Sequence, residues 1–344
     1  MATPASPEPR YRGVIVGSGG IARLAHLPAF RDAPRVRRRV DIVAMLDSDP
    51  GVPPVPGLPL LTRRDQLAEL GRVDFIDICT PTASHLELAL WGLSQGYHVV
   101  CEKPVALSRT EADRLSAAAR AHDRVLVPCH QYRYNPVWRQ IRDWLATGTI
   151  GAWHLAELSV HRLLADPGAR TAGTPWRGTR EDGKGGVLLD HGTHLIYQLL
   201  DLGGAPSAVS AWIGRLGHRE YDVEDTASVL LEFPGRLATL FVTWAARERD
   251  NRVRFIGDAG TIEWVGGELR LERAGRSERI DFTAELDKAS YSGWFAGLFE
   301  TFVGAMDSRI ADPHLDDIRR VATVLELAYE AARTGRTQPF PAPA

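Results

Sequence analysis

Residues 11–22 read YRGVIVGSGGIA, an apolar run that leads into a glycine-rich turn. The run predicts a buried first strand, and the turn fits the G-x-G-x-x-A pattern that follows a strand and opens a helix. In this pattern Gly17 permits a tight turn, and Gly19 lets the backbone approach a pyrophosphate. The amino terminus of the helix then faces the phosphates. The stretch predicts a doubly wound parallel α/β sheet, a Rossmann fold, with Gly17, Gly19, Gly20 and Ile21 at a dinucleotide.

An acidic residue marks the end of the second predicted strand. This strand spans residues 41–46 and ends at Asp47, and an acid at this tip binds the ribose hydroxyls in dinucleotide sites. The separation from the glycines exceeds the usual value of about twenty residues, which an arginine-rich stretch between them explains. Asp49 adds a second negative charge that repels a 2′-phosphate. We therefore expect NAD, rather than NADP, as the cofactor.

A short loop follows the next predicted strand, residues 73–79. It contains Thr80, Pro81 and, at the start of a helical pattern, His85. In a doubly wound sheet this loop lies beside the phosphate turn, so we expect its residues to contact the cofactor. For His85, a local hydrogen bond at the helix start is an equally good interpretation.

A later strand leads into a lysine. Residues 99–104 read VVCEKP, after a helical pattern at 84–93 and before the capping box Ser108–Glu111. Glu102 and Lys103 then lie just beyond the carboxyl end of a strand, where open α/β sheets bind ligands. A Glu-Lys-Pro turn by itself is typical of a solvated surface. Only together with the other motifs does it become a candidate for cofactor contact and chemistry.

Composition and length set broad limits. The 344 residues favour about two domains, and a formal net charge of -2 gives no hint of nucleic-acid binding. The apolar runs are too short to cross a bilayer, and residues 1–10 lack the apolar core of a signal peptide, so we expect a cytoplasmic protein that binds no membrane. The three cysteines match neither a disulfide framework nor a zinc pattern. No metal site is expected.

The second half of the chain has a different pattern from the first. From residue 151 onward, several strands follow one another instead of alternating with helices, which favours a mostly antiparallel sheet in an α+β domain. The candidate strands lie at residues 152–160, 208–213, 226–233, 236–243, 252–256 and 261–265, and two helical segments follow at 291–307 and 315–334. We expect a disordered leader at 1–9, an NAD-binding Rossmann domain at 10–130, and a substrate-binding and oligomerisation domain at 131–344.

This strand-rich half has too few helices to cover both faces of a large open sheet. An exposed apolar sheet face usually marks an interface. We therefore expect a homodimer or homotetramer that forms through the sheet of the second domain.

A second polar cluster lies within residues 185–197, which read GGVLLDHGTHLIY. The pattern from residue 190 to 202 predicts one helix, with Asp190 and His194 at i and i+4 on the same face. An aspartate at this position orients a histidine ring, and histidine is suited to proton transfer near neutrality. An N-capping aspartate beside an unrelated histidine explains the same pattern equally well. His191, between them, is expected to point elsewhere.

Together the dinucleotide turn, the Glu-Lys-Pro turn and the Asp-x-x-x-His pattern after two glycines resemble the Gfo/Idh/MocA family, which includes glucose-fructose oxidoreductase and inositol dehydrogenase. The similarity runs from about Arg12 to Phe340. It implies a Rossmann domain followed by a domain with a large open sheet. It also implies a catalytic set of Lys103, Asp190 and His194, and a segment, Trp176 and Arg177, that approaches the nicotinamide or the substrate. Tyr197 departs from the aspartate of many relatives, which we expect to affect helix packing or pocket shape rather than the reaction.

The resemblance implies hydride transfer between NAD and a secondary alcohol or ketone of a small polyhydroxylated substrate: a sugar, a cyclitol or a sugar derivative. His194 then serves as the general base, Lys103 binds the same oxygen, and Asp190 orients His194 or holds a neighbouring hydroxyl. One alternative is an enzyme that recycles bound NAD for elimination, epimerisation or glycoside cleavage. Another is a non-catalytic regulator that binds the dinucleotide.

Overall fold

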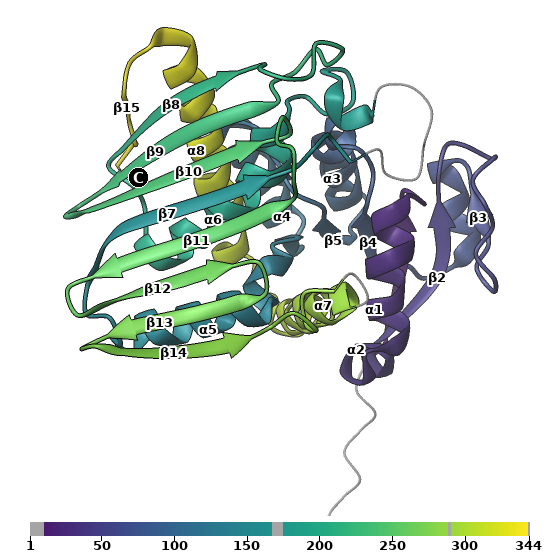
Figure 1. The fold of residues 1–344 in the computed structure, drawn as a ribbon. Coiled ribbons are helices and arrows are strands. Elements are labelled where there is room, and N and C mark those ends of the chain that lie inside the picture. The colour runs from purple at the N-terminus through teal and green to yellow at the C-terminus, as the bar shows by residue number, and fades with distance from the viewer. Residues whose placement is uncertain (1–9, 167–174, 288–289, 343–344) are drawn as a thin grey trace, which may run out of the picture.

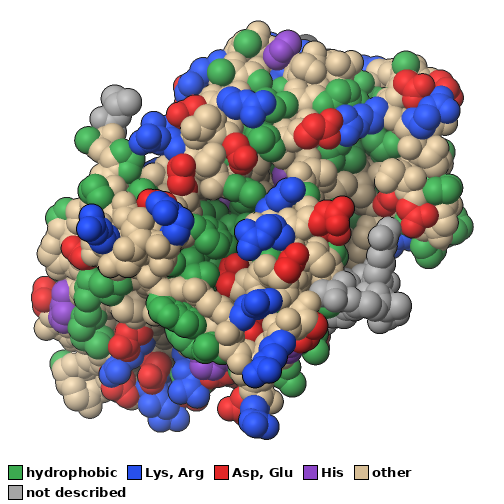
Figure 2. All heavy atoms as spheres, turned by 90° about the horizontal axis from the view of Figure 1, so that it is seen from above, with side chains coloured by type: hydrophobic (Ala, Val, Ile, Leu, Met, Phe, Trp, Pro, Cys, Tyr) green, Lys and Arg blue, Asp and Glu red, His purple; other side chains and the backbone are tan. Residues whose placement is uncertain are grey.

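The computed structural model describes residues 10–166, 175–287 and 290–342. The predicted leader at 1–9 lies outside these residues. The described chain forms two sheets, one of six strands and one of nine, with helices packed against both (Figure 1). On the face shown in Figure 2, acidic and basic side chains are interspersed. No helix of the described residues is long and apolar enough to span a membrane.

The six-stranded sheet is parallel and has the order β3-β2-β1-β4-β5-β6. This is the doubly wound order, in which ligands bind beyond the carboxyl ends of the strands. All four residues of β4 are buried, because helices cover both faces of a parallel sheet. The strands are β1 (Tyr11–Val16), β2 (Val40–Leu46), β3 (Leu60–Leu61), β4 (Phe75–Ile78), β5 (His98–Cys101) and β6 (Leu126–Pro128).

Helices from both ends of the chain cover this sheet. One apolar cluster joins the sheet to α1, α2 and α7, and Phe30 stacks on Phe299 with ring centroids 3.8 Å apart. A second cluster joins the opposite face to α3, α4 and the first turns of α8. The helices are α1 (Leu27–Asp32), α2 (Pro34–Arg39), α3 (His85–Ser94), α4 (Arg109–Ala121), α7 (Tyr291–Ser308) and α8 (Asp312–Thr334). The proposed division at residue 130 thus separates the two sheets but not all the helices that cover them.

The nine-stranded sheet has the order β14-β13-β12-β11-β7-β10-β9-β8-β15. Only the β7–β10 pair is parallel, so the predicted large, mostly antiparallel sheet is confirmed. The strands are β7 (Trp153–His161), β8 (Ala208–Gly214), β9 (Thr226–Phe233), β10 (Arg236–Thr243), β11 (Asp250–Gly257), β12 (Gly260–Val265), β13 (Glu268–Arg273), β14 (Arg276–Asp281) and β15 (Gln338–Pro339). The pattern did not predict β13, β14 or β15. In β14 the sequence RSERID lacks the apolar alternation of a half-buried strand, and five of its six residues are exposed.

Helices cover one face of the nine-stranded sheet, and in Figure 1 they lie behind it. These are α5 (Pro136–Ala146), α6 (Thr193–Gly203) and part of α8. Asn135 caps α5 by accepting hydrogen bonds from the backbone N–H groups of Val137 and Trp138, with Pro136 at the first helical position.

The segment predicted as one helix from residue 190 begins differently. Residues 188–192 form a π-helical turn, and the α-helix α6 starts at Thr193. The expected pair Asp190 and His194 therefore spans the boundary between this π turn and α6.

Candidate active site

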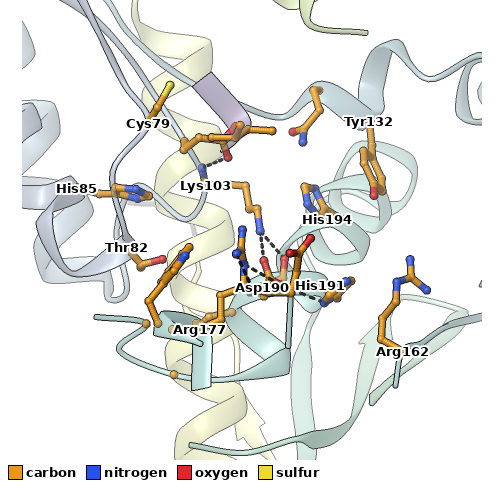
Figure 3. A pocket seen from close by; sticks show the side chains of 18 of the residues that line it. Cys79, Thr82, His85, Lys103, Tyr132, Arg162, Arg177, Asp190, His191 and His194 are labelled. Atoms are coloured by element: carbon orange, nitrogen blue, oxygen red, sulfur yellow. Dashed lines mark hydrogen bonds and ion pairs between the residues drawn. The ribbon is translucent and has the colours of Figure 1, made fainter. Parts of the chain in front are cut away.

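A pocket of about 450 Å³ lies between the two sheets. It gathers most of the residues that the sequence singled out: Ile21, Thr80, His85, Glu102, Lys103, Trp176, Arg177, Asp190 and His194. The predicted cofactor residues Gly17, Gly19, Gly20, Asp47 and Pro81 are outside its lining. Figure 3 shows Lys103 entering from the parallel sheet, with Asp190 below it and His194 to one side.

Lys103 is tied to Asp190. Its Nζ donates to the Asp190 carboxylate at 2.7 Å and to the Asp190 carbonyl oxygen at 2.6 Å, and the two side chains are only 10% and 16% exposed. No hydrogen bond joins Asp190 to His194 among the described residues. In this structure the aspartate therefore orients the lysine, whereas the sequence pattern suggested that it orients the histidine.

Asp190 is the anion at the centre of several cations. Arg177 lies 3.4 Å from its carboxylate, and the Arg177 guanidinium also stacks over the Trp176 ring at 4.3 Å. Burial alone would raise the pKa of Asp190, but Lys103 and then Arg177 outweigh it and hold that pKa well below its usual range. Asp190 thus stays ionised and holds Lys103 in place.

The ring of His194 is fixed by two tyrosines. It stacks on Tyr132 with centroids 4.2 Å apart, and its Nδ1 lies 3.0 Å from the Tyr197 hydroxyl. That hydroxyl already accepts a hydrogen bond from the Tyr132 backbone N–H at 3.0 Å. Burial raises the pKa of Tyr197 well above its usual value, so the phenol keeps its proton. Since its oxygen already accepts from the Tyr132 N–H, we infer that the Tyr197 O–H donates a hydrogen bond to Nδ1.

This bond decides where the proton of His194 lies. Burial, followed by the charge of Lys103, lowers the pKa of His194 well below its usual value, so the ring is neutral. With Nδ1 accepting from Tyr197, the single ring proton is on Nε2. Tyr197 therefore acts on the ring that the prediction made catalytic, an effect that the sequence reasoning did not foresee.

His191 lines the pocket as well, although it was expected to point elsewhere. Its Nδ1 accepts from the Trp244 indole N–H at 3.2 Å, and burial lowers the pKa of His191 to about 3. The consecutive residues Asp190 and His191, both in the π turn, thus line the same pocket. The sequence pattern did not predict that turn.

A buried cluster of charges supports the Lys103 backbone. His26 Nδ1 lies 2.8 Å from Asp77 and its Nε2 lies 3.0 Å from Glu102, while the other oxygen of Glu102 accepts from the Lys103 N–H at 3.2 Å. Burial alone would lower the pKa of His26, but Asp77 outweighs it and raises that pKa well above its usual value. His26 is thus a buried cation between two carboxylates. One hint of the cluster is visible in the sequence, a polar Asp77 inside an apolar strand.

The same region contains the one group of three metal-ligating side chains that lie close together among the described residues. Ligand atoms of His26, Asp77 and Cys129 lie within 4.8 Å of one another. Both ring nitrogens of His26 already face carboxylates, so a metal ion would have to displace one of them. We keep the expectation that the protein uses no metal.

The glycine-rich turn has room for a dinucleotide. Gly17 has a φ of +94°, and a Cβ there would meet the Cys79 and Thr80 backbone at 2.9 Å, so only glycine fits. At Gly19 a Cβ would meet nothing within 4 Å, which leaves the backbone open to a phosphate. Asp47 accepts from the Ser18 N–H at 2.8 Å, which fixes the acid beside the turn. These residues fit the predicted cofactor.

His85 is buried between two backbone carbonyl groups. Its ring nitrogens lie 2.8 Å from the Thr80 oxygen and 2.8 Å from the Pro104 oxygen. The ring thereby ties together the two loops that follow β4 and β5, while it also lines the pocket. Both interpretations of this residue, local bonding and a place at the ligand site, are compatible with that position.

Comparisons with known proteins identify the family of this chain. A family described as "Oxidoreductase family, NAD-binding Rossmann fold" matches residues 11–130, and the "GFO/IDH/MocA C-terminal domain" matches residues 138–263. The chain belongs to the Gfo/Idh/MocA family of oxidoreductases. It is an NAD-binding oxidoreductase, as the resemblance implied.

Two relatives show the range of the family. D-glucoside 3-dehydrogenase of Escherichia coli is 27% identical over 72% of this chain and 75% of that protein. Trans-1,2-dihydrobenzene-1,2-diol dehydrogenase of Xenopus laevis is 27% identical over 77% of this chain and 80% of that protein. Among solved structures, GenD2 from gentamicin A biosynthesis, in complex with NAD, has a TM-score of 0.81 and 25% identity over 99% of both chains.

Proposed function

We propose that the protein transfers a hydride between NAD and a secondary alcohol or ketone of a sugar, a cyclitol or a sugar derivative. The observation that carries this proposal is that Lys103, which follows β5, and His194, on α6, line one pocket. The two named relatives are dehydrogenases of a glucoside and of a diol, which supports a substrate with neighbouring hydroxyl groups.

The residues that would hold the cofactor come from the parallel sheet and one loop of the second half. NAD supplies the hydride acceptor, or NADH the donor, when bound. We assign its binding to Gly17, Gly19, Gly20, Ile21, Asp47, Thr80, Pro81, His85, Glu102, Lys103, Trp176 and Arg177.

Two donors act on one substrate oxygen in this proposal. Lys103, held by Asp190, gives its proton to a carbonyl oxygen in the direction of reduction and takes a proton back in the direction of oxidation. His194 donates from Nε2 to the same oxygen and stabilises its negative charge. The assignment of His194 as the base, expected from the sequence, would require the Tyr197 hydroxyl to turn away from Nδ1.

The test is a screen for NADH formation. Polyols, sugars and sugar nucleotides are each mixed with NAD and the purified protein, with controls that omit the protein or the NAD. We expect NADH to accumulate with at least one polyhydroxylated compound. If every compound that is consumed leaves the NAD bound and oxidised at the end of turnover, the recycling enzyme replaces the dehydrogenase.

We also propose that the protein assembles through the face of its nine-stranded sheet that the described helices leave uncovered. Trp212, Ser228 and Phe241 are register partners across β8, β9 and β10, so their side chains lie on one face. Trp212 is 50% exposed and Phe241 is 38% exposed. Light scattering should find a dimer or tetramer at micromolar concentration, and a monomer in Trp212→Glu. A monomeric wild type would contradict the proposal.

A cytoplasmic location stays a prediction from the sequence.

A further inference from the structure

A second cavity, of about 140 Å³, opens beside the first. The two share seven lining residues, whereas Lys103 and Glu102 line only the first. The shared residues are Tyr132, Arg162, His191, His194, Arg249, Tyr291 and Trp294. In Figure 3 Arg162 lies beyond His191, on the opposite side of the pocket from Thr82 and His85. The second cavity is therefore an extension of the substrate side of the pocket, away from the residues assigned to the cofactor.

The charge of this cavity has one sign. Among the described residues that line it are two arginines, Arg162 and Arg249, and neither an aspartate nor a glutamate. Such a cavity attracts an anion, because an enclosed guanidinium is costly unless a negative charge or several acceptors face it.

Arg162 is held by neutral acceptors. It follows β7 and is only 9% exposed. Its Nη1 donates to the carbonyl oxygens of His161 and Asp250, and its Nη2 donates to the Asn251 side chain at 2.9 Å. No carboxylate forms an ion pair with it in the described part of the chain. These bonds fix the orientation of the guanidinium without neutralising its charge.

Arg249 brings a second cation to the same opening. Its side chain is exposed and has no hydrogen bond or ion pair with the described residues. Burial and then the charge of Arg249 lower the pKa of Arg162, so the two guanidinium groups lie close enough to repel each other. An anion between them would remove that repulsion.

Neutral donors face the cavity too. The indole Nε1 of Trp138, which lines it, is buried without a partner. The Tyr132 hydroxyl has no hydrogen-bond partner among the described residues, and burial raises its pKa, so it keeps its proton and can donate. An indole N–H is a donor only. The lining thus includes donors without a protein partner, which suit an oxygen-rich anion.

We propose that this cavity binds an anionic group of the substrate, a carboxylate or a phosphate, and that the enzyme acts on an acidic sugar derivative. The binding of an anion does not depend on the proposed function, whereas the choice of an acidic sugar derivative rests on it. In such a substrate the hydroxyl that reacts lies at Lys103, and the anionic group lies at Arg162 and Arg249. The pyrophosphate of the cofactor is a different anion, because residues 17–22 contribute nothing to this cavity.

The first experiment measures anion binding without turnover. Inorganic phosphate and acetate are titrated separately into the NAD-saturated protein, and tryptophan fluorescence is followed because Trp138, Trp264 and Trp294 line the cavity. We expect saturable binding of at least one anion by the wild type. In Arg249→Ala the dissociation constant should rise at least about tenfold, since a charge-assisted hydrogen bond is lost. The anion that binds more tightly identifies the group as phosphate or carboxylate.

The matched control is Arg247→Ala, a change two residues away at an exposed arginine that does not line the cavity. It should bind both anions as the wild type does. Arg162→Gln provides a second test, with circular dichroism to verify its fold. The proposal is overturned if the wild type shows no saturable binding, or if Arg249→Ala and Arg247→Ala bind alike.

The second experiment connects the cavity to the reaction. The kcat/KM values for D-glucuronate, D-glucose 6-phosphate and neutral D-glucose are compared in wild type, Arg249→Ala and Arg247→Ala. We expect an anionic sugar to be preferred, and Arg249→Ala alone to lose that preference while its NAD affinity is unchanged. NADH formation that favours glucose in all three proteins would overturn the subsite and leave the dehydrogenase intact. Saturable anion binding without any NADH formation would keep the anion subsite and overturn the proposed dehydrogenase activity.

Discussion

The wall of the pocket that carries Lys103 and the wall that carries Arg162 balance their charges in opposite ways. Lys103 is paired with Asp190, and the buried His26 beneath it lies between Asp77 and Glu102. Arg162, on the other wall, meets only carbonyl oxygens and an amide. A wall whose charges are already paired keeps its groups in fixed positions, as chemistry requires. A wall with unbalanced positive charge is stabilised most when an anionic ligand binds to it.

Removing the lysine should have the largest effect on the paired wall. We expect Lys103→Met to lower kcat by about a hundred- to ten-thousand-fold, the usual range for loss of a proton-transfer group. Its NAD affinity should fall far less than kcat, because the other residues assigned to the cofactor remain, as a direct titration can verify. If His194→Ala costs this much and Lys103→Met does not, the base is His194, as the sequence suggested.

The next largest effect should be on the free energy of unfolding, through the buried charge cluster of His26, Asp77 and Glu102. His26→Leu leaves Asp77 and Glu102 without their cation, and breaking a buried ion pair costs about 3–5 kcal/mol. The matched control is His154→Leu, which removes an exposed histidine 3.6 Å from Asp258 and should change the unfolding free energy by less than about 0.5 kcal/mol. Urea unfolding measures both. Equal stability of the two variants would mean that the cluster contributes nothing net.

The same cluster predicts a pH dependence with a definite sign. Because the pKa of His26 is raised in the folded protein, its stabilising contribution is complete below the unfolded value of about 6.5. It is lost as the pH rises through the folded value. His154→Leu should show this loss on the alkaline side and His26→Leu should not. A wild-type stability that is flat up to alkaline pH would contradict a protonated His26.

The paired wall was easier to predict from the sequence than the open one. Lys103, the glycine turn and Asp47 follow strands of a parallel sheet, and the carboxyl ends of such strands meet at one edge. Local pattern therefore predicted both the fold of that half and the place of its site residues. The six candidate strands of the second half were also found, since their apolar alternation is local.

Other parts of the site depend on contacts between distant segments. Arg162 follows β7 and Arg249 precedes β11, and only the pairing of those strands brings them together. Lys103 is joined to Asp190 across 87 residues of chain, so the spacing between Asp190 and His194 could not predict this partner. His26 is joined to Glu102 across 76 residues of chain. No local period contains that information.

Cofactor choice should respond to a smaller change. Asp47→Asn removes the negative charge but keeps an oxygen that can accept from the Ser18 N–H, so it isolates charge from loop geometry. We expect the ratio of NAD to NADP affinity to fall about tenfold, since repulsion of the 2′-phosphate weakens. Fluorescence titration with both cofactors measures the ratio. A ratio unchanged in Asp47→Asn and reduced only in Asp47→Ala would assign the preference to loop geometry instead.

The smallest effect should come from Tyr197, whose hydroxyl fixes the histidine between the two walls. Tyr197→Phe removes the donor to Nδ1, so the His194 proton is free to occupy either nitrogen and Nε2 is no longer always a donor. We expect kcat to fall about two- to tenfold, the cost of one ordinary hydrogen bond. The matched control is Tyr134→Phe, another largely buried tyrosine, whose hydroxyl bonds to Thr301 outside the pocket.

The protonation of the His194 ring nitrogens, which a change in packing alone would not alter, tests this last prediction. In the wild type the ¹⁵N shifts of His194 should report a proton on Nε2. Because the pKa of His194 is well below its usual value, those shifts should also stay constant from about pH 6 to pH 8. In Tyr197→Phe they should move toward a mixture of the two tautomers, and in Tyr134→Phe they should not. A wild-type proton on Nδ1 would make Nε2 an acceptor, return the base role to His194, and leave Lys103 as the group that holds the substrate oxygen.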